Sequence, residues 1–134
     1  MTGTVNIIDV GHGNAAIAQG DGWTVMVDAA PAASVIQAIE HLGVNRVDRL
    51  VVSHRDHDHA GGVVPLLARR ELEIDTIFIA ADAAKNPNAP ATALLLAALE
   101  AAKVSGRCRV SRDLDDALPA GTLDGGGLTV EVLA

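Results

Sequence analysis

The sequence predicts an α/β domain in which helices cover a sheet. Apolar runs of strand length alternate with longer segments that carry apolar residues at helical spacing. The content of 49% hydrophobic and 20% charged residues is that of a globular protein. A length of 134 residues, without an internal repeat or a linker, indicates one domain, residues 1–134.

The first part of the chain predicts a strand and then a β-hairpin. Thr4–Val10 alternates apolar and polar residues before it becomes wholly apolar, as a strand entering a core does. Asn14–Gln19 and Trp23–Asp28 are two further runs of β type. The short connection between them, Gly20-Asp21-Gly22, contains glycine and favours a hairpin.

A helix is predicted after the hairpin. Pro31 opens the segment, Ser34 is a candidate N-cap, and Gly43 is a suitable stop. The residues at helical spacing are Val35, Ile36, Ile39 and Leu42.

Strands and helices alternate through the rest of the chain. Gly125-Gly126-Gly127 before Leu128–Leu133 predicts a final hairpin, which is cut off at Ala134 as if in the middle of a domain. The other predicted elements are strands at Arg49–Ser53, Ile74–Ala80 and Cys108–Val110, helices at Val63–Arg70 and Thr92–Val104, and a proline-containing loop at 86–90.

Composition narrows the function classes. The chain has one Phe, one Trp, no Tyr and a net charge of −7. It therefore lacks both the basic field and the aromatic platforms of nucleic-acid-binding proteins, which makes nucleic acid a doubtful substrate. A single cysteine, Cys108, allows no internal disulfide. Without a basic leader or an apolar run of membrane length, we expect a soluble, cytoplasmic chain with no membrane segment.

Residues 54–62 contain a cluster of histidine and aspartate residues that indicates a metal site. Imidazole nitrogens and carboxylate oxygens are ligands for zinc, manganese and iron. The cluster follows a predicted strand and precedes Gly61-Gly62 and a helix, so that its side chains can converge at the end of a sheet. The cluster consists of His54, Asp56, His57, Asp58 and His59.

The cluster has two other interpretations, a solvated polar loop and a calcium-binding loop. A solvated polar loop, with Arg55 paired to an aspartate, would be the default for any one of these residues but not for five within six positions. The sequence excludes a calcium-binding EF-hand loop, because Ala60 and Leu67 stand where that loop requires acidic residues.

Ser53–Gly62 resembles the first metal motif of the metallo-β-lactamase superfamily, His-x-[His/Asp]-x-Asp-His. The aspartate at its third position is similar to the version in the hydrolase domain of ComEC-type competence proteins, which internalise DNA. Asp9–Ala15 resembles the Asp-Val-Gly-Gln-Gly-Asp-Ala opening of that branch, and Val25–Asp28 resembles its Leu-Ile-Asp-Gly-Gly strand.

The resemblance implies an αββα sandwich built from two similar halves, of which this chain is the N-terminal half. His54 and Asp56 would then bind the first metal, and Asp58 and His59 the second. Asp58 would also lie beside the nucleophilic water, as the catalytic residue. His57 falls on a variable position and is at most a residue that holds a ligand in place. The complete site would hold two divalent metals, zinc first, with manganese or iron as alternatives.

The implied reaction is hydrolysis by a metal-bound hydroxide shared by two ions about 3.5–4 Å apart. A phosphodiester or related ester, including a small-molecule one, is the expected substrate. A lactonase or thioesterase of the same superfamily is the lesser alternative, because those enzymes usually carry His where Asp56 stands.

The chain also departs from the family pattern. His12 and Asn14 replace Gln and Asp, and Ala29-Ala30 replaces two glycines. His12 and Asp28 could hold a metal ligand in place, although a loop-surface His and a strand-end Asp are equally good interpretations. His41, on the predicted helix, is expected at the surface.

No histidine follows His59, so the ligands that the second half of the family fold supplies are missing. We therefore expect a fragment with an exposed inner sheet face, completed by a C-terminal half or by a homodimer. A second hypothesis is a catalytically incomplete domain that acts as an interaction or assembly module.

Overall fold

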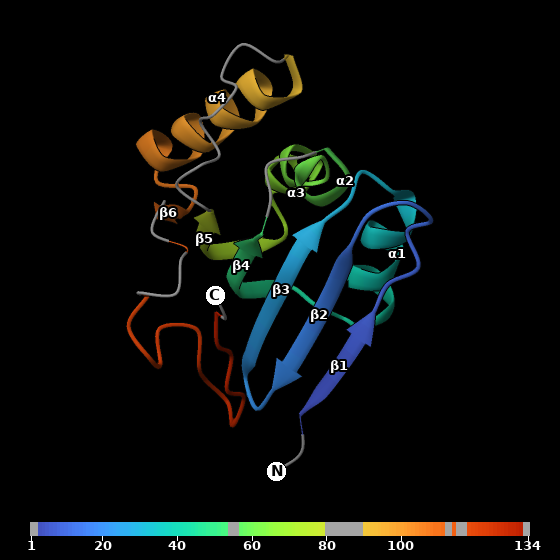
Figure 1. The fold of residues 1–134 in the computed structure, drawn as a ribbon, viewed down its shortest axis with the longest axis vertical. Coiled ribbons are helices and arrows are strands. Elements are labelled where there is room, and N and C mark those ends of the chain that lie inside the picture. The colour runs from blue at the N-terminus through green and yellow to red at the C-terminus, as the bar shows by residue number, and fades with distance from the viewer. Residues whose placement is uncertain (1–2, 54–56, 80–89, 112–113, 115–117, 133–134) are drawn as a thin grey trace.

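The computed structural model describes residues 3–53, 57–79, 90–111, 114 and 118–132. They form one six-stranded sheet with strand order β1-β2-β3-β4-β5-β6, flanked by helices (Figure 1). The predicted α/β class is confirmed. Within these residues, no helix is both long and apolar enough to span a membrane.

The N-terminal half of the sheet is antiparallel. It consists of β1 (Thr4–Ile7), β2 (Ala15–Gly20) and β3 (Trp23–Ala29). Gly20 pairs with Trp23 across a two-residue turn, in which Gly22 has a φ of 67°. Such turns need positive φ, which glycine adopts without strain. The predicted hairpin is confirmed.

The other half of the sheet is parallel to β3. Right-handed crossovers that proceed in one direction across a sheet leave their helices on one face. The strands are β4 (Arg46–Val52), β5 (Glu73–Ile79) and β6 (Arg109–Ser111), and the connecting helices are α1 (Ala33–His41), α2 (His57–Ala60), α3 (Val63–Ala68) and α4 (Pro90–Ser105).

The main core lies between the sheet and these helices. Its side chains are aliphatic, as the composition predicts, and the central strands contribute the most buried of them. Representative members are Ile17, Met26, Leu50 and Ile77 from the sheet and Val35, Leu66 and Leu99 from the helices.

Several predicted boundaries are corrected by the structure. Ser34 lies inside α1, and Ala32 is the N-cap without a side-chain hydrogen bond. Gly43, with a φ of 67°, does end that helix. The first predicted parallel strand begins at Arg46, three residues earlier than expected. Of the final hairpin, only the Gly125–Leu128 bridge forms, and residues 129–132 are not a strand.

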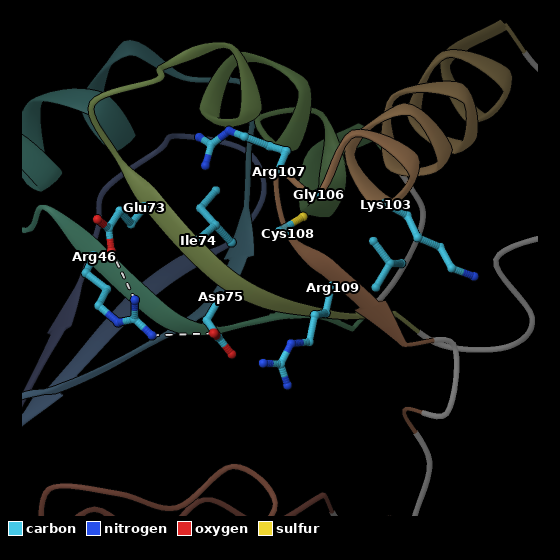
Figure 2. A pocket seen from close by; sticks show the side chains of 10 residues that line it. Arg46, Glu73, Ile74, Asp75, Lys103, Gly106, Arg107, Cys108 and Arg109 are labelled. Atoms are coloured by element: carbon cyan, nitrogen blue, oxygen red, sulfur yellow. Dashed lines mark hydrogen bonds and ion pairs between the residues drawn. The ribbon is translucent and has the colours of Figure 1, made fainter.

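An open cavity of about 610 Å³ lies at the edge of the sheet where the parallel strands begin (Figure 2). Arg107 stabilises the wall of this cavity by donating hydrogen bonds to the carbonyl oxygens of Leu67, Arg69 and Leu72. Those bonds tie the end of α3 and the turn that follows it to the start of β6.

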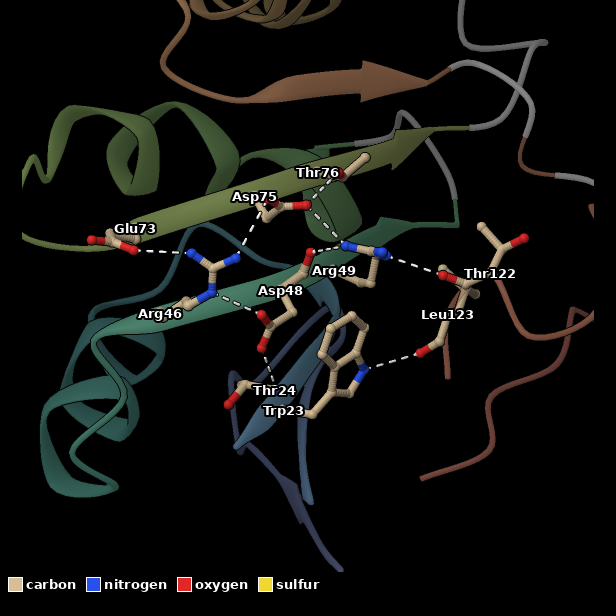
Figure 3. Close-up of polar contacts among 10 residues, drawn as sticks. All are labelled: Trp23, Thr24, Arg46, Asp48, Arg49, Glu73, Asp75, Thr76, Thr122 and Leu123. Atoms are coloured by element: carbon tan, nitrogen blue, oxygen red, sulfur yellow. Dashed lines mark hydrogen bonds and ion pairs between the residues drawn. The ribbon is translucent and has the colours of Figure 1, made fainter. Parts of the chain in front are cut away.

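The C-terminal segment 118–132 packs on the sheet face opposite the helices. The indole of Trp23 donates a hydrogen bond to the carbonyl of Leu123, and Nε of Arg49 donates to that of Thr122 (Figure 3). The Arg49 guanidinium also stacks over the Trp23 ring at 4.8 Å. This segment covers the apolar residues Val25, Val51 and Phe78.

The β1 end of the same sheet face is open. Val5 and Ile7 are 67% and 82% exposed, although both are large apolar residues on a strand. They pair with Ala18 and Ala16, so the uncovered strip continues across β2. The expected exposure of the inner sheet face is therefore found in part, because residues 118–132 cover its centre.

Candidate metal centre

Asp28 is a buried carboxylate at the end of β3. It is 1% exposed and has a φ of 60°, the left-handed region that non-glycine residues rarely occupy. Among the described residues, it is the one non-glycine position with positive φ. Backbone strain of this kind concentrates at functional sites, where surrounding contacts hold it in place.

Four hydrogen-bonding contacts compensate the burial of the Asp28 carboxylate. The backbone N–H of Ser53 donates to Oδ1 at 2.7 Å, and the Ser53 hydroxyl donates to Oδ2 at 2.7 Å. The side-chain amide of Asn14 donates to Oδ2 at 3.1 Å. Nδ1 of His59 lies 2.9 Å from the same oxygen. A buried carboxylate is tolerated when its oxygens are bonded in this way.

Three chain segments meet at this carboxylate. Asn14 ends the β1–β2 loop, Ser53 directly follows β4, and His59 lies in α2. The backbone also ties the first loop to the end of β3, since the N–H of Ala30 donates to the carbonyl of Asn14 at 3.2 Å. Carboxyl ends of neighbouring parallel strands lie at one edge of a sheet, which explains how β3 and β4 bring these groups together.

The contact with Asp28 favours one tautomer of His59. Beside an ionised carboxylate, which only accepts hydrogen bonds, a neutral ring donates from Nδ1. In that tautomer Nε2 keeps its lone pair, the form in which a neutral histidine binds a metal. The His59 side chain is 24% exposed. Asp28 therefore holds the ring on its Nδ1 side, while part of the ring is accessible to solvent.

Gly62 lets the His/Asp loop approach the end of β3. Its N–H donates to the carbonyl of Ala29 at 2.6 Å. A Cβ at this position would lie 2.5 Å from the carbonyl oxygen of Ala30 and 2.8 Å from that of Ala29, closer than real contacts allow. The expectation that the glycines after the His/Asp cluster permit a close turn is met at this residue.

The predicted ligands are only partly described. His54 and Asp56 lie outside the described residues, and His57 and Asp58 are described in their backbone alone, within α2. Among the side chains that the structure describes, no three His, Cys, Asp or Glu residues gather as a metal-binding group. The four-ligand set therefore stays a prediction.

Two further histidines lie in the part of the chain that the structure describes. His12 is exposed in the β1–β2 loop, and His41 is exposed at the end of α1, as expected. Of the three residues proposed to hold a ligand in place, Asp28 is the one whose contact with a predicted ligand is described.

Ser53 and Asn14 were not predicted as partners of Asp28. Their signal in the sequence is positional, because each lies at the end of a strand or of a loop that leads to one edge of the sheet. The order of the strands brings Ser53 and Asn14 to the same edge of the sheet. That order cannot be read from the residues themselves.

Comparisons with known proteins identify the family and the fold. The sequence profile described as the Metallo-beta-lactamase superfamily matches residues 8–77, which contain Asp28, Ser53 and His59. No curated protein matches the chain at a significant level.

A solved structure shares the fold. It is described as the crystal structure of a new diphosphatase from the PhnP family, with a TM-score of 0.57 and 14% sequence identity. The match covers 90% of this chain and 54% of that one, so the present chain spans about half the length of that protein.

Proposed function

Because the chain belongs to the metallo-beta-lactamase superfamily, we propose that it supplies the His/Asp metal loop of a hydrolase that cleaves a phosphodiester or related ester. The observation that carries this proposal is the hydrogen bond between Asp28 and His59. A carboxylate behind a histidine ligand is a common arrangement at metal centres, where it fixes the tautomer and the ring orientation.

The proposed ligands are His54 and Asp56 for one metal and Asp58 and His59 for the other. Nitrogen and carboxylate oxygen donors suit zinc first and also manganese or iron. Bound there, divalent ions would supply the Lewis acidity that activates water and stabilises a leaving oxygen. Asp58, next to His59 in α2, would orient the attacking water and accept its proton.

Asp28 is a positioning residue in this proposal. It holds the His59 ring through Nδ1 and is itself held by Ser53 and Asn14. Because each of these donors comes from a different segment, a shift of any one segment would move the ring. Preorganisation of this kind reduces the free energy needed to arrange the ligands.

A phosphate ester is favoured over a lactone or thioester for three reasons. Asp56 stands where lactonases and thioesterases usually carry histidine, and the motif resembles that of the ComEC-type hydrolases. The solved structure with the same fold is a diphosphatase. A net charge of −7 disfavours a nucleic-acid polymer, so a small phosphate ester is the better substrate class.

The chain needs further ligands to complete this centre. Two protein ligands for each metal do not fill the coordination of zinc or manganese, and no histidine follows His59. We propose that a second segment, from a longer polypeptide or a second copy of this chain, provides them. The open strip at Val5 and Ile7 offers that segment an apolar surface.

The missing histidines also favour a second candidate function, an interaction module that has lost catalysis. The two proposals differ in hydrolysis of bis(4-nitrophenyl) phosphate with added Zn²⁺ or Mn²⁺. Measured on the assembly that includes the completing segment, the hydrolase proposal expects turnover that Asp58→Ala abolishes and His41→Ala leaves unchanged. Metal binding without turnover of this phosphodiester, or of a lactone, would favour the interaction module. Equal turnover in Asp58→Ala would refute the assigned role of Asp58.

A further inference from the structure

A second candidate site lies at the opposite end of the sheet from Asp28. The cavity of about 610 Å³ is bordered by Arg46 and Glu73, the first residues of β4 and β5. Asp28 and Ser53 lie at the other ends of β3 and β4. Seven-residue strands such as β4 separate the two places by about 20 Å at roughly 3.3 Å per residue. The cavity is therefore distinct from the candidate metal centre.

Positive charge gathers in this cavity although the chain as a whole is acidic. Two carboxylates, Glu73 and Asp75, also border it, so the lining carries a formal surplus of two positive charges. The chain as a whole has a net charge of −7, so a local excess of positive charge is unusual. The four basic residues of the lining are Arg46, Lys103, Arg107 and Arg109.

Two of the four cations are occupied by the protein itself. Arg46 donates to Asp48, Glu73 and Asp75 at 2.8, 3.0 and 3.4 Å. Arg107 donates to three backbone carbonyls at the end of α3 and the start of β5. These bonds hold both side chains against the wall of the cavity.

Arg109 and Lys103 are the cations that remain. Within the described ranges, neither side chain has a hydrogen bond or an ion pair. Asp75 attracts Arg109 electrostatically, but its oxygens already accept from Arg46, Arg49 and Thr76. Figure 2 shows the Arg109 guanidinium extending from the start of β6 toward Asp75, and Lys103 extending from the last turn of α4. The planar donor fork of Arg109 is thus presented to the cavity.

We propose that this cavity binds a small organic phosphate monoester, whose phosphate group Arg109 holds. A guanidinium matches two phosphate oxygens in a bidentate contact. The surplus of two positive charges complements a monoester, which carries about −1.5 to −2 at neutral pH. The volume falls in the range of small-molecule sites, about 300–1,000 Å³.

The test is a titration of the ¹⁵N-labelled chain with phenyl phosphate, followed by amide chemical shifts in the presence of EDTA. EDTA removes divalent metal, so that a phosphate bound at the candidate metal centre does not contribute. We expect shifts in residues 73–75 and 106–110. Arg109→Gln should weaken binding about tenfold, the effect of losing a charged hydrogen bond, and Lys103→Gln should weaken it less.

Arg70→Gln is the matched control, because Arg70 is also an exposed arginine but does not line the cavity. It should leave binding unchanged, and circular dichroism should show all three variants folded. Equal binding in Arg109→Gln and the unaltered chain would overturn the proposal, as would shifts centred elsewhere. Benzoate binding as tightly as phenyl phosphate would overturn the assignment to phosphate. Inorganic phosphate binding as tightly would overturn the assignment to an organic monoester.

Discussion

Oδ2 of Asp28 lies 2.9 Å from Nδ1 of His59 and joins the end of β3 to α2, positions 31 residues apart in the sequence. The same carboxylate accepts both the N–H and the hydroxyl of Ser53. One buried group thereby couples the fold of the sheet to the orientation of the histidine ring. The account of a metal centre depends on this coupling.

Asp28→Asn should weaken zinc binding by about 10–100-fold, the usual effect of removing a partner behind a metal ligand. An amide in place of the carboxylate no longer attracts the Nδ1 proton of His59. Competition with a chromophoric chelator measures the affinity.

The matched control for this variant is Asp48→Asn. Asp48 is also a buried carboxylate, 5% exposed, but it accepts from Arg46 and Thr24 near the other ends of the strands. This change should lower thermal stability without weakening zinc binding. If both variants lost zinc to the same extent, the effect would be one of general unfolding and not of ligand positioning.

Gly62→Ala should lower both stability and zinc affinity. The added Cβ would overlap the carbonyl oxygens of Ala29 and Ala30, and overpacking of this kind costs about 1–3 kcal/mol. To avoid the overlap, the loop must move away from β3 and carry His59 with it. Denaturant unfolding and zinc titration of the same sample measure the two effects.

Gly43→Ala separates stability from metal binding. Gly43 also has positive φ, but a Cβ there meets no atom within 4 Å. The left-handed backbone costs an alanine about 1–2 kcal/mol, so stability should fall while zinc affinity stays the same. Unchanged zinc affinity in Gly62→Ala would contradict the role given to that close approach.

Gly125→Ala should displace the C-terminal segment from the sheet. A Cβ at Gly125 would overlap the indole of Trp23, whose N–H donates to Leu123. Trp23 is the only tryptophan of the chain, so its fluorescence reports this contact directly. We expect emission at longer wavelength, as the ring becomes hydrated.

Gly121→Ala is the control in the same segment, because a Cβ there meets open space. Its positive φ of 86° makes the variant less stable, yet the tryptophan emission of the folded chain should not change. An unchanged spectrum for Gly125→Ala would show that the segment does not pack on Trp23 in solution.

Ionised Asp75 should stabilise the folded chain, so the free energy of unfolding should fall when acid protonates it. The hydrogen bond from Thr76 and the nearby cations Arg109, Arg49 and Arg46 lower the pKa of this carboxyl. An acid with a lowered pKa in the folded state adds stability above its unfolded pKa of about 3.9. That stability is lost as the pH falls through the folded pKa.

Asp75→Asn should therefore flatten the decline of stability below about pH 4, measured by urea unfolding between pH 2 and 7. Glu40→Gln is a suitable comparison, because Glu40 is exposed and pairs only with Arg69. A decline in Asp75→Asn as steep as in the unaltered chain would assign the acid sensitivity to other carboxylates.

Much of the fold could be predicted from local patterns. Strand-length runs and the Gly20-Asp21-Gly22 connection identified the hairpin, and Gly43 identified a helix end. The Ser34 cap was wrong because the helix begins at Ala33, two residues before the start that a cap at Ser34 predicts, and tertiary packing outweighs the capping preference of serine.

Long-range contacts could not be read from the sequence. The start of β4 at Arg46 depends on hydrogen bonds to β5, since Arg46 pairs with Glu73. The final run from Leu128 has strand-like residues, but it contacts the sheet face through Val130 and Val132 and does not extend the sheet. Likewise, Asp28 was a candidate by resemblance alone, and its contacts with Ser53 and Asn14 required the strand order.

The central claim is that residues 54–59 hold metal, and titration of the purified chain with Zn²⁺ tests it most directly. We predict that His59→Ala and His54→Ala each weaken zinc binding at least about tenfold, while His41→Ala, which removes an exposed histidine from α1, has no effect. Zinc binding that is the same in all three variants and in the unaltered chain would contradict the assignment of the metal centre to this loop.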